Sequence, residues 1–176
     1  IYKIDLGSKS KISKISFIGN KIYKDKKLKN IIISEEYKFW KFISGKKYLN
    51  EKVNKLDLRL LKNFYLNKGY YNVEINSSFA KMIAENEFEL IFNIQTNNKI
   101  YFEDLTLELP IDFNRENFQT LEKIFSDVRG LPYSINVIQE ILDEIDLITI
   151  NEQYESIKAS VKENIELDKI NIVFTI

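Results

Sequence analysis

Apolar and polar residues alternate along six short stretches of this 176-residue chain, and such alternation predicts β-strands with one buried and one exposed face. The predicted strands lie at residues 15–18, 71–79, 88–94, 105–109, 157–161 and 170–176. Between the first and second strands of each half, apolar residues recur at the three- and four-residue spacing of amphipathic helices. Each half is therefore predicted to be α+β, with the order β-α-α-β-β and a three-stranded sheet packed on two helices.

The helices carry recognisable end signals. Asn50 is predicted to cap the strongest helix, Gly69 to end it, and Asp25 to cap the shorter helix before it. The apolar face of the strongest helix is predicted to consist of Val53, Leu56, Leu60 and Phe64. Trp40 lies between the two helices, where we expect it to fill the core, the alternative being an anchor for a partner.

The two halves repeat one another and carry opposite charge. Segments 15–18, 45–48 and 90–94 resemble 105–108, 130–133 and 172–176 in the same order. Residues 1–98 hold 19 Lys and Arg against 10 Asp and Glu, a net charge of +9, whereas residues 99–176 hold 7 against 16, a net charge of −9. The zero net charge of the chain is therefore the sum of two oppositely charged modules joined near the polar run 95–98.

The composition argues against an enzyme. The chain has no Cys and no His, which excludes disulfides, thiolate metal sites and a Ser-His-Asp triad. Asp143, Glu144 and Asp146 lie opposite the apolar face of a predicted helix, where a solvated acidic face is expected rather than a metal site. We therefore expect no catalytic residues, no metal and no cofactor. Because the chain begins at Ile1 without an initiator Met, we expect it to be a piece of a longer protein.

A lysine-rich stretch between Lys9 and Lys29 allows a different interpretation, a small basic nucleic-acid-binding domain. The stretch contains no arginine, no GxxG loop and no pair of RNP-like aromatic residues on a strand. No nucleic-acid partner is therefore expected, and this function is kept as an alternative.

Four segments of the first half together resemble a POTRA domain. They are 15–20 with its Gly-Asn turn, Trp40, the Gly-Lys-Lys-Tyr run at 45–48, and 60–70 with its terminal Gly69-Tyr70. More specifically, residues 7–97 resemble the third POTRA module of the BamA family of outer-membrane assembly proteins, and residues 98–176 are similar to the fourth. Residues 1–6 would then end a preceding module. The second half departs from the pattern, since Leu109-Pro110 replaces the Gly-Asn turn and no glycine precedes Tyr154.

This resemblance implies two tandem POTRA modules in the periplasmic part of a Gram-negative outer-membrane protein. The implied role is non-catalytic: binding of unfolded outer-membrane proteins and of BamB-like and other Bam lipoproteins. Other proteins with POTRA units remain alternatives, namely two-partner-secretion transporters, TamA-like proteins and FtsQ-like division proteins.

The resemblance also implies a mechanism, the addition of a partner strand to the second strand of each sheet, which lies on an open edge. The stretch 71–79 contains no proline and only one charged residue, Glu74, so little in it blocks such pairing. The residues predicted to form the edges are Tyr71, Val73, Ile75 and Ser77 in the first module and Ile157, Ala159 and Val161 in the second.

Overall fold

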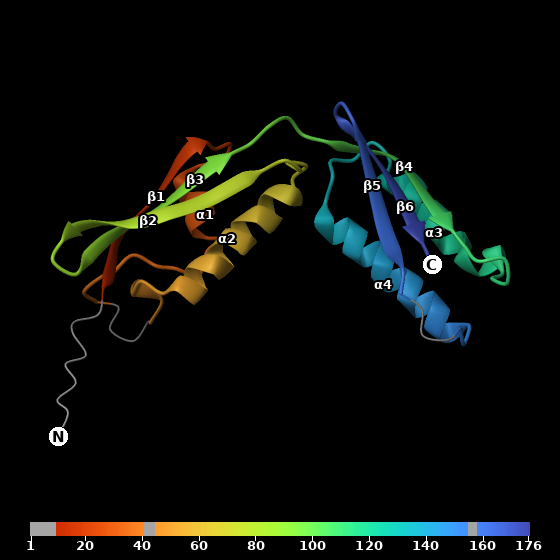
Figure 1. The fold of residues 1–176 in the computed structure, drawn as a ribbon, viewed down its shortest axis with the longest axis horizontal. Helices are drawn as coiled ribbons and strands as arrows, with labels where there is room; N and C mark the ends of the chain where they lie inside the picture. The colour runs from red at the N-terminus through yellow and green to blue at the C-terminus, as the bar shows by residue number, and fades with distance from the viewer. Residues whose placement is uncertain (1–9, 41–44, 155–157) are drawn as a thin grey trace, which may run out of the picture. The chain divides into compact units, whose positions relative to one another are not determined.

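The computed structural model describes residues 10–40, 45–154 and 158–176 (Figure 1). The described residues divide into two compact units. The first unit contains the residues up to Phe64 together with Asn72–Thr96, and the second contains Tyr65–Tyr71 together with the residues from Asn97 onward. The predictions for residues 1–6 and for Ile157 lie outside the described residues.

The first unit holds one three-stranded sheet in the order β1-β3-β2. Its elements are β1 (Lys11–Asn20), α1 (Asp25–Lys29), the 3₁₀ turn η1 (Gly45–Lys47), α2 (Glu51–Leu66), β2 (Glu74–Ala84) and β3 (Glu87–Gln95). Strand β3 lies in the centre, parallel to β1 and antiparallel to β2. Figure 1 shows α2 running along one face of this sheet.

Alternation along β3 accounts for the core of the first unit. Leu90, Phe92 and Ile94 are buried, because every second side chain of a strand points to the same face, as the alternation in 88–94 indicates. Phe92 stands opposite Phe17 in the register of β3 and β1, and the two rings stack with their centroids 5.4 Å apart. This stack is a fixed contact between the two parallel strands.

Helix α2 begins as predicted but buries a different face. Asn50 Oδ1 accepts the main-chain N–H groups of Lys52 and Val53, which caps the helix. The predicted stripe of Val53, Leu56, Leu60 and Phe64 is only half-buried. The fully buried residues of the helix are instead Asp57, Leu61 and Tyr65. Within the half-buried stripe, Phe64 contacts the ring of Tyr23, with the ring centroids 4.9 Å apart.

Two predicted features of the segment between β1 and α2 are wrong. Asp25 is the first residue of α1 rather than its cap; Lys24 occupies the cap position without a side-chain bond. Trp40 does not fill the core: its side chain is 59% exposed and packs edge-on against Phe39, which is itself 71% exposed.

The second unit repeats the same topology, with the sheet order β4-β6-β5. Its elements are β4 (Tyr101–Glu108), the 3₁₀ turn η2 (Arg115–Phe118), α3 (Gln119–Val128), α4 (Ile135–Asn151), β5 (Ser160–Glu166) and β6 (Lys169–Thr175). The central strand β6 buries Ile170, Ile172 and Phe174 against α3 and α4, and Phe125 of α3 stacks on Phe174. Both units therefore have the predicted α+β order.

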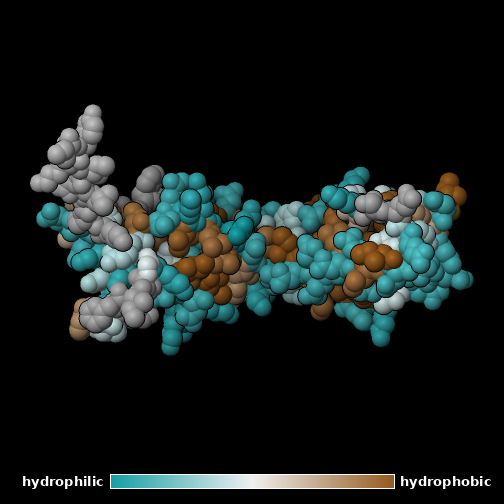
Figure 2. Space-filling view, turned by 90° about the horizontal axis from the view of Figure 1, so that it is seen from below, coloured by the Kyte–Doolittle hydropathy of each residue, from teal (hydrophilic) through white to brown (hydrophobic). Residues whose placement is uncertain are grey.

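The surface is mixed in character. On the face drawn in Figure 2, hydrophobic side chains form separate patches between hydrophilic ones. Among the exposed large apolar residues, Met82 and Ile83 lie near the end of β2 and Leu147 and Ile150 lie near the end of α4. Within the described residues, no helix is long and apolar enough to cross a membrane.

Candidate partner-binding edges

Strand β2 lies at one edge of the first sheet. Its neighbour β3 pairs with only one of its sides, from Glu74 opposite Gln95 to Ala84 opposite Glu87. Along a strand the main-chain N–H and C=O groups of successive residues point to opposite sides, so every second residue of β2 directs these groups away from β3. Among the described residues no strand pairs with those outward groups, which leaves them available to another chain.

The opposite edge of the same sheet, strand β1, is covered by its own chain. The main-chain N–H of Tyr37 donates to the carbonyl oxygen of Ile12 at 2.6 Å. The N–H of Ile15 donates to Oε1 of Glu36 at 2.9 Å, and the ammonium group of Lys21 donates to the carbonyl oxygen of Phe17 at 2.7 Å. One edge of this sheet is thus closed by local contacts, whereas the other is open.

Glu36 holds its place on β1 through a second contact. Lys29 Nζ donates to the same oxygen, Oε1, at 2.5 Å. Burial alone raises the pKa of the Glu36 carboxyl, but the hydrogen bonds from Lys29 and from the N–H of Ile15 outweigh burial, so its pKa is lowered overall. The carboxylate is therefore charged near neutral pH, as a strong acceptor for the Ile15 N–H should be.

The four residues predicted to form the first edge do not all lie in β2. Ile75 and Ser77 do: both are half-buried, and the Ser77 hydroxyl accepts a hydrogen bond of 2.9 Å from Asn54 Nδ2 of α2. Val73 precedes the strand and is buried, and Tyr71 lies in the turn before it. The strand begins at Glu74 rather than at 71, because the apolar alternation of 71–73 reflects packing in the turn. It ends at Ala84 rather than at 79.

Tyr71 belongs instead to a cluster in the second unit. Its hydroxyl and that of Tyr133 both donate to the carboxylate of Glu163, at 2.5 Å and 3.1 Å, and the two rings meet edge to face at 4.9 Å. The bond to Glu163 raises the pKa of Tyr71 to about 12, and burial followed by the charge of Glu163 raises the pKa of Tyr133. Both hydroxyls stay protonated and donate throughout the physiological range.

The second predicted edge falls partly on β5, an edge strand of the second sheet. Val161 lies in β5 and is half-buried, while Ala159 lies one residue before the strand. Nearly all other side chains of β5 are exposed. Glu163, on the same face as Val161, was missed by the sequence analysis because its tyrosine partners are distant in the chain.

The lysines of the basic stretch are largely engaged within the first unit. Lys14 pairs with Glu89, Lys21 with Asp25 and Lys29 with Glu36, while Lys11 and Lys27 each lie 4.6 Å from a tyrosine ring centre. Lysines held by carboxylates and rings do not form an unopposed phosphate-binding surface. This arrangement disfavours the nucleic-acid alternative.

The chain is similar to known proteins both in sequence and in fold. Residues 10–97, half of the chain, match the family model described as "POTRA: Surface antigen variable number repeat". The chain belongs to the POTRA family. The predicted fold class, tandem POTRA modules of α+β type, is confirmed by structural similarity as well.

Relatives of this POTRA chain include outer-membrane assembly factors. It is 26% identical over 142 residues to the "Outer membrane protein assembly factor BamA" of Neisseria meningitidis, an alignment covering 81% of this chain and 18% of that protein. The protein of the same name from Buchnera aphidicola is 25% identical over 134 residues, covering 69% of this chain and 22% of that protein. The chain thus spans about a fifth of the length of these relatives.

A solved structure has the same fold. The crystal structure of POTRA3-5 of Haemophilus influenzae BamA superposes with a TM-score of 0.71 at 15% identity, covering 96% of this chain and 66% of that one. At this identity the similarity concerns the fold. It supports the assignment of both units to the POTRA fold, including the second, which the family model does not cover.

Proposed function

We propose that this chain is a non-catalytic, periplasmic segment of a BamA-like outer-membrane protein assembly factor, and that strand β2 binds an extended segment of an unfolded outer-membrane protein. The family and the names of the relatives support the assembly role. The open edge of β2 supports the mode of binding, because an extended chain can continue the antiparallel ladder there.

The observation that carries this proposal is the difference between the two edges of the first sheet. The Ile12, Ile15 and Phe17 main-chain groups on β1 are bonded by a loop, a carboxylate and an ammonium group, whereas β2 has no such cover among the described residues. An exposed edge invites aggregation unless it is protected, so an unprotected one suits a binding role. Main-chain hydrogen bonds do not depend on the side chains of the client, so they suit many different clients.

The expected affinity of such an edge is low. A main-chain hydrogen bond contributes about 0.5–1.5 kcal/mol net, so five or six of them leave a modest surplus after the entropy of association. Several weak edges in series raise the effective concentration of the next contact and retain a client without trapping it. Weak binding at β2 is thus consistent with a carrier that must release its client.

Lipoproteins of the BamB type are proposed as further partners of the same unit. Residues 1–98 carry a net charge of +9, since they hold 19 Lys and Arg against 10 Asp and Glu. A field of this sign speeds the approach of an acidic surface, and salt screens it. We therefore expect association rates of partners with the first unit to fall as the salt concentration rises.

The proposed client site can be tested by cross-linking, because the chain contains no cysteine of its own. Asn76→Cys places a benzophenone label on an exposed position of β2, and Lys14→Cys places it on an exposed position of the covered strand β1. The probe is an outer-membrane β-barrel protein unfolded in urea and diluted with the labelled chain. We expect a cross-linked product from position 76 and little from position 14. Equal yields at the two positions would contradict the proposal.

A proline pair provides the mechanistic control. Only one of Asn76→Pro and Ser77→Pro removes an outward N–H and leaves the ladder to β3 intact, because main-chain direction alternates. The variant that keeps the far-ultraviolet circular dichroism of the parent chain is the informative one. It should lose client cross-linking from a label placed at Glu74→Cys. Undiminished cross-linking would show that the client does not add to the β2 edge.

A further inference from the structure

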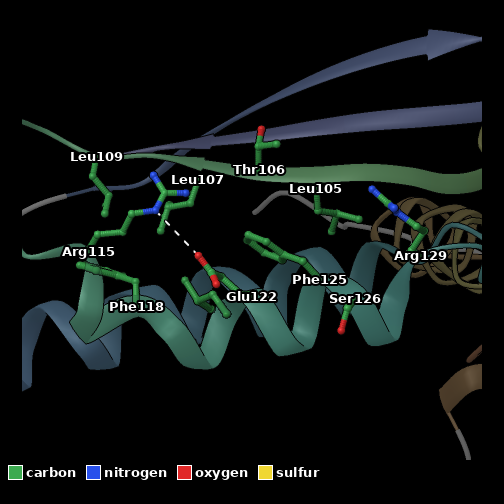
Figure 3. A pocket seen from close by; sticks show the side chains of 11 residues that line it. Leu105, Thr106, Leu107, Leu109, Arg115, Phe118, Glu122, Phe125, Ser126 and Arg129 are labelled. Carbon is green, nitrogen blue, oxygen red and sulfur yellow. Dashed lines mark ion pairs between the residues drawn. The ribbon is translucent and has the colours of Figure 1, made fainter.

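The second unit contains an apolar groove between strand β4 and helix α3, with a volume of about 550 Å³ (Figure 3). Leu105, Leu107 and Leu109 point into it from the strand side, and Phe125 points up from the helix. Thr106 points to the other face of β4, as strand alternation requires. Arg115 and Arg129 lie at opposite ends of the groove.

The strand that borders this groove has outward main-chain groups. Strand β4 is an edge of its sheet, paired only with β6. The N–H of Ile176 donates to the carbonyl oxygen of Glu108, so Glu108 and, by alternation, Thr106 direct their main-chain groups toward β6. Leu105 and Leu107 consequently direct theirs away from the sheet, along the opening of the groove.

The corresponding edge strand of the first unit is β1, and its outward main-chain groups are bonded by other residues of the chain. Its Ile12, Ile15 and Phe17 hold the sheet positions that Phe102, Leu105 and Leu107 hold in the second unit, since a register shift follows the first residue of each set. Ile12 accepts from Tyr37 as Phe102 accepts from Gly130, both through main-chain groups. The two edges thus begin alike.

Beyond that point the edges differ. In the first unit the chain segment around Glu36 lies on β1 and its carboxylate takes the N–H of Ile15, while Lys21 reaches the carbonyl oxygen of Phe17. For Leu105 and Leu107, no such bond is formed by any residue in the described part of the chain. The space next to Ile15 is also smaller, about 390 Å³, and is lined by Lys29, Glu35, Glu36 and Lys38 rather than by leucines.

We propose that the groove between β4 and α3 binds an extended peptide segment of another protein, which pairs with the main chain of Leu105 and Leu107, buries apolar side chains in the groove and places a carboxylate at Arg115. The first unit supplies the precedent, because there a segment containing Glu36 and Tyr37 bonds to the corresponding strand. The leucine lining favours apolar side chains on alternate residues of the peptide.

Charge complementarity assigns the acidic residue of the peptide to the Arg115 end. The side chain of Arg115 is 72% exposed, and its Nε lies 3.8 Å from the carboxylate of Glu122, too far for a hydrogen bond. At the other end, Arg129 already donates to the main-chain oxygen of Glu103 and to Asp104. Arg115 therefore retains the donors that a peptide carboxylate would use in a paired contact.

This site is independent of the proposed client site on β2, and its failure would leave that proposal standing. The probe is a fluorescein-labelled eight-residue peptide in which valine and phenylalanine alternate with threonine, with one glutamate near an end. Its binding to the 176-residue chain is followed by fluorescence anisotropy. In ¹⁵N NMR spectra we expect the largest shifts at Leu105, Leu107 and residues of α3, and slower hydrogen exchange at the Leu105 and Leu107 amides.

Matched variants separate the groove from the rest of the strand. Leu107→Arg fills the groove with a charge, whereas Thr106→Arg places the same charge on the opposite face of β4. Ser126→Trp closes the groove from an exposed position of α3, so it tests the site without touching the sheet. We expect Leu107→Arg and Ser126→Trp to weaken binding at least about tenfold, and Thr106→Arg to leave it unchanged.

The charge assignment has its own test. Arg115→Glu should weaken the binding of the glutamate peptide about tenfold and strengthen the binding of a peptide with lysine in place of glutamate. The proposal is overturned if the parent chain does not bind the peptide at millimolar concentration, if Ser126→Trp binds as well as the parent, or if the shifts fall on β2 or β5. It is also overturned if the groove amides respond to an apolar dye but not to the peptide, or shift with protein concentration alone, which would indicate a second copy of the chain.

Discussion

The buried carboxylate of Asp57 accepts the main-chain N–H of Ile33 at 2.6 Å and that of Ser34 at 3.3 Å. Asp57→Ala leaves both donors buried without a partner, so we expect the free energy of unfolding of the first unit to fall by about 2–3 kcal/mol. Asp57→Asn retains an acceptor and should lose about half as much. Hydrogen exchange of the amides in β1 and β3 measures this stability. Arg59→Ala, at an exposed position of the same helix, should change it by less than about 0.5 kcal/mol.

The tyrosine cluster predicts a loss of stability of the second unit at alkaline pH. The pKa of Tyr71 is raised to about 12 by its bond to Glu163, and that of Tyr133 is raised by burial and by the same carboxylate. In the unfolded chain both lose their protons near pH 10. The stabilisation is therefore complete below pH 10 and is lost as pH rises through the folded pKa values.

The measurement is the stability of the second unit between pH 9 and pH 12, followed by hydrogen exchange in β6 or by urea unfolding. Glu163→Gln removes the charge, so the tyrosinate absorbance of Tyr71 should appear at lower pH, and the stability of the second unit should decline less steeply with pH. Tyr101→Phe is the control, since Tyr101 is exposed and outside the cluster. A stability that declines equally in Glu163→Gln and in the parent chain would rule out the cluster as the cause.

The strand centres could be predicted from the sequence because burial of every second side chain is a local pattern. Phe88, Leu90, Phe92 and Ile94 were predicted to share one face; the last three are buried, and Phe88 is half-buried. The start of β2 was misplaced because the same alternation continues into a turn. The hydroxyl of Tyr71 donates to Glu163, and Val73 is buried before the strand begins. Alternation reports burial, and it does not report whether the burying contacts belong to a sheet.

The polar contacts of the candidate sites could not be predicted, because their partners are distant in the chain. Asp57 is outside the apolar face predicted for its helix, yet it is buried, and its partners at Ile33 and Ser34 lie in a separate loop. Glu36 on the edge of β1 depends on a loop whose path has no periodic signal. Which edge is open is therefore a property of loop placement, and sequence patterning alone leaves it undetermined.

Gly19 is predicted to tolerate no side chain. Its φ is +91°, and a Cβ there would overlap the carbonyl oxygen of Ile94 in the central strand β3. Gly19→Ala must therefore shift the backbone of β1 or β3, and we expect a loss of about 2–4 kcal/mol in the stability of the first unit. Gly45→Ala is the matched control, because a Cβ at that position would have no atom within 4 Å beyond its chain neighbours. A Gly19→Ala variant as stable as Gly45→Ala would show that the strand contact is looser than its geometry indicates.

The exposure of Trp40 predicts that this residue contributes little to folding. It is the single tryptophan of the chain, its side chain is 59% exposed, and its described contacts are with Phe39 at 4.6 Å and with the ammonium group of Lys38 at 5.9 Å. Trp40→Ala should therefore change the free energy of unfolding by less than about 0.5 kcal/mol, whereas Phe17→Ala, which removes a core ring stacked on Phe92, should cost about 3–5 kcal/mol. In the native chain, acrylamide should quench the tryptophan fluorescence nearly as well as in urea. Protection from acrylamide in the native chain, together with a large loss of stability in Trp40→Ala, would place the ring in the core instead.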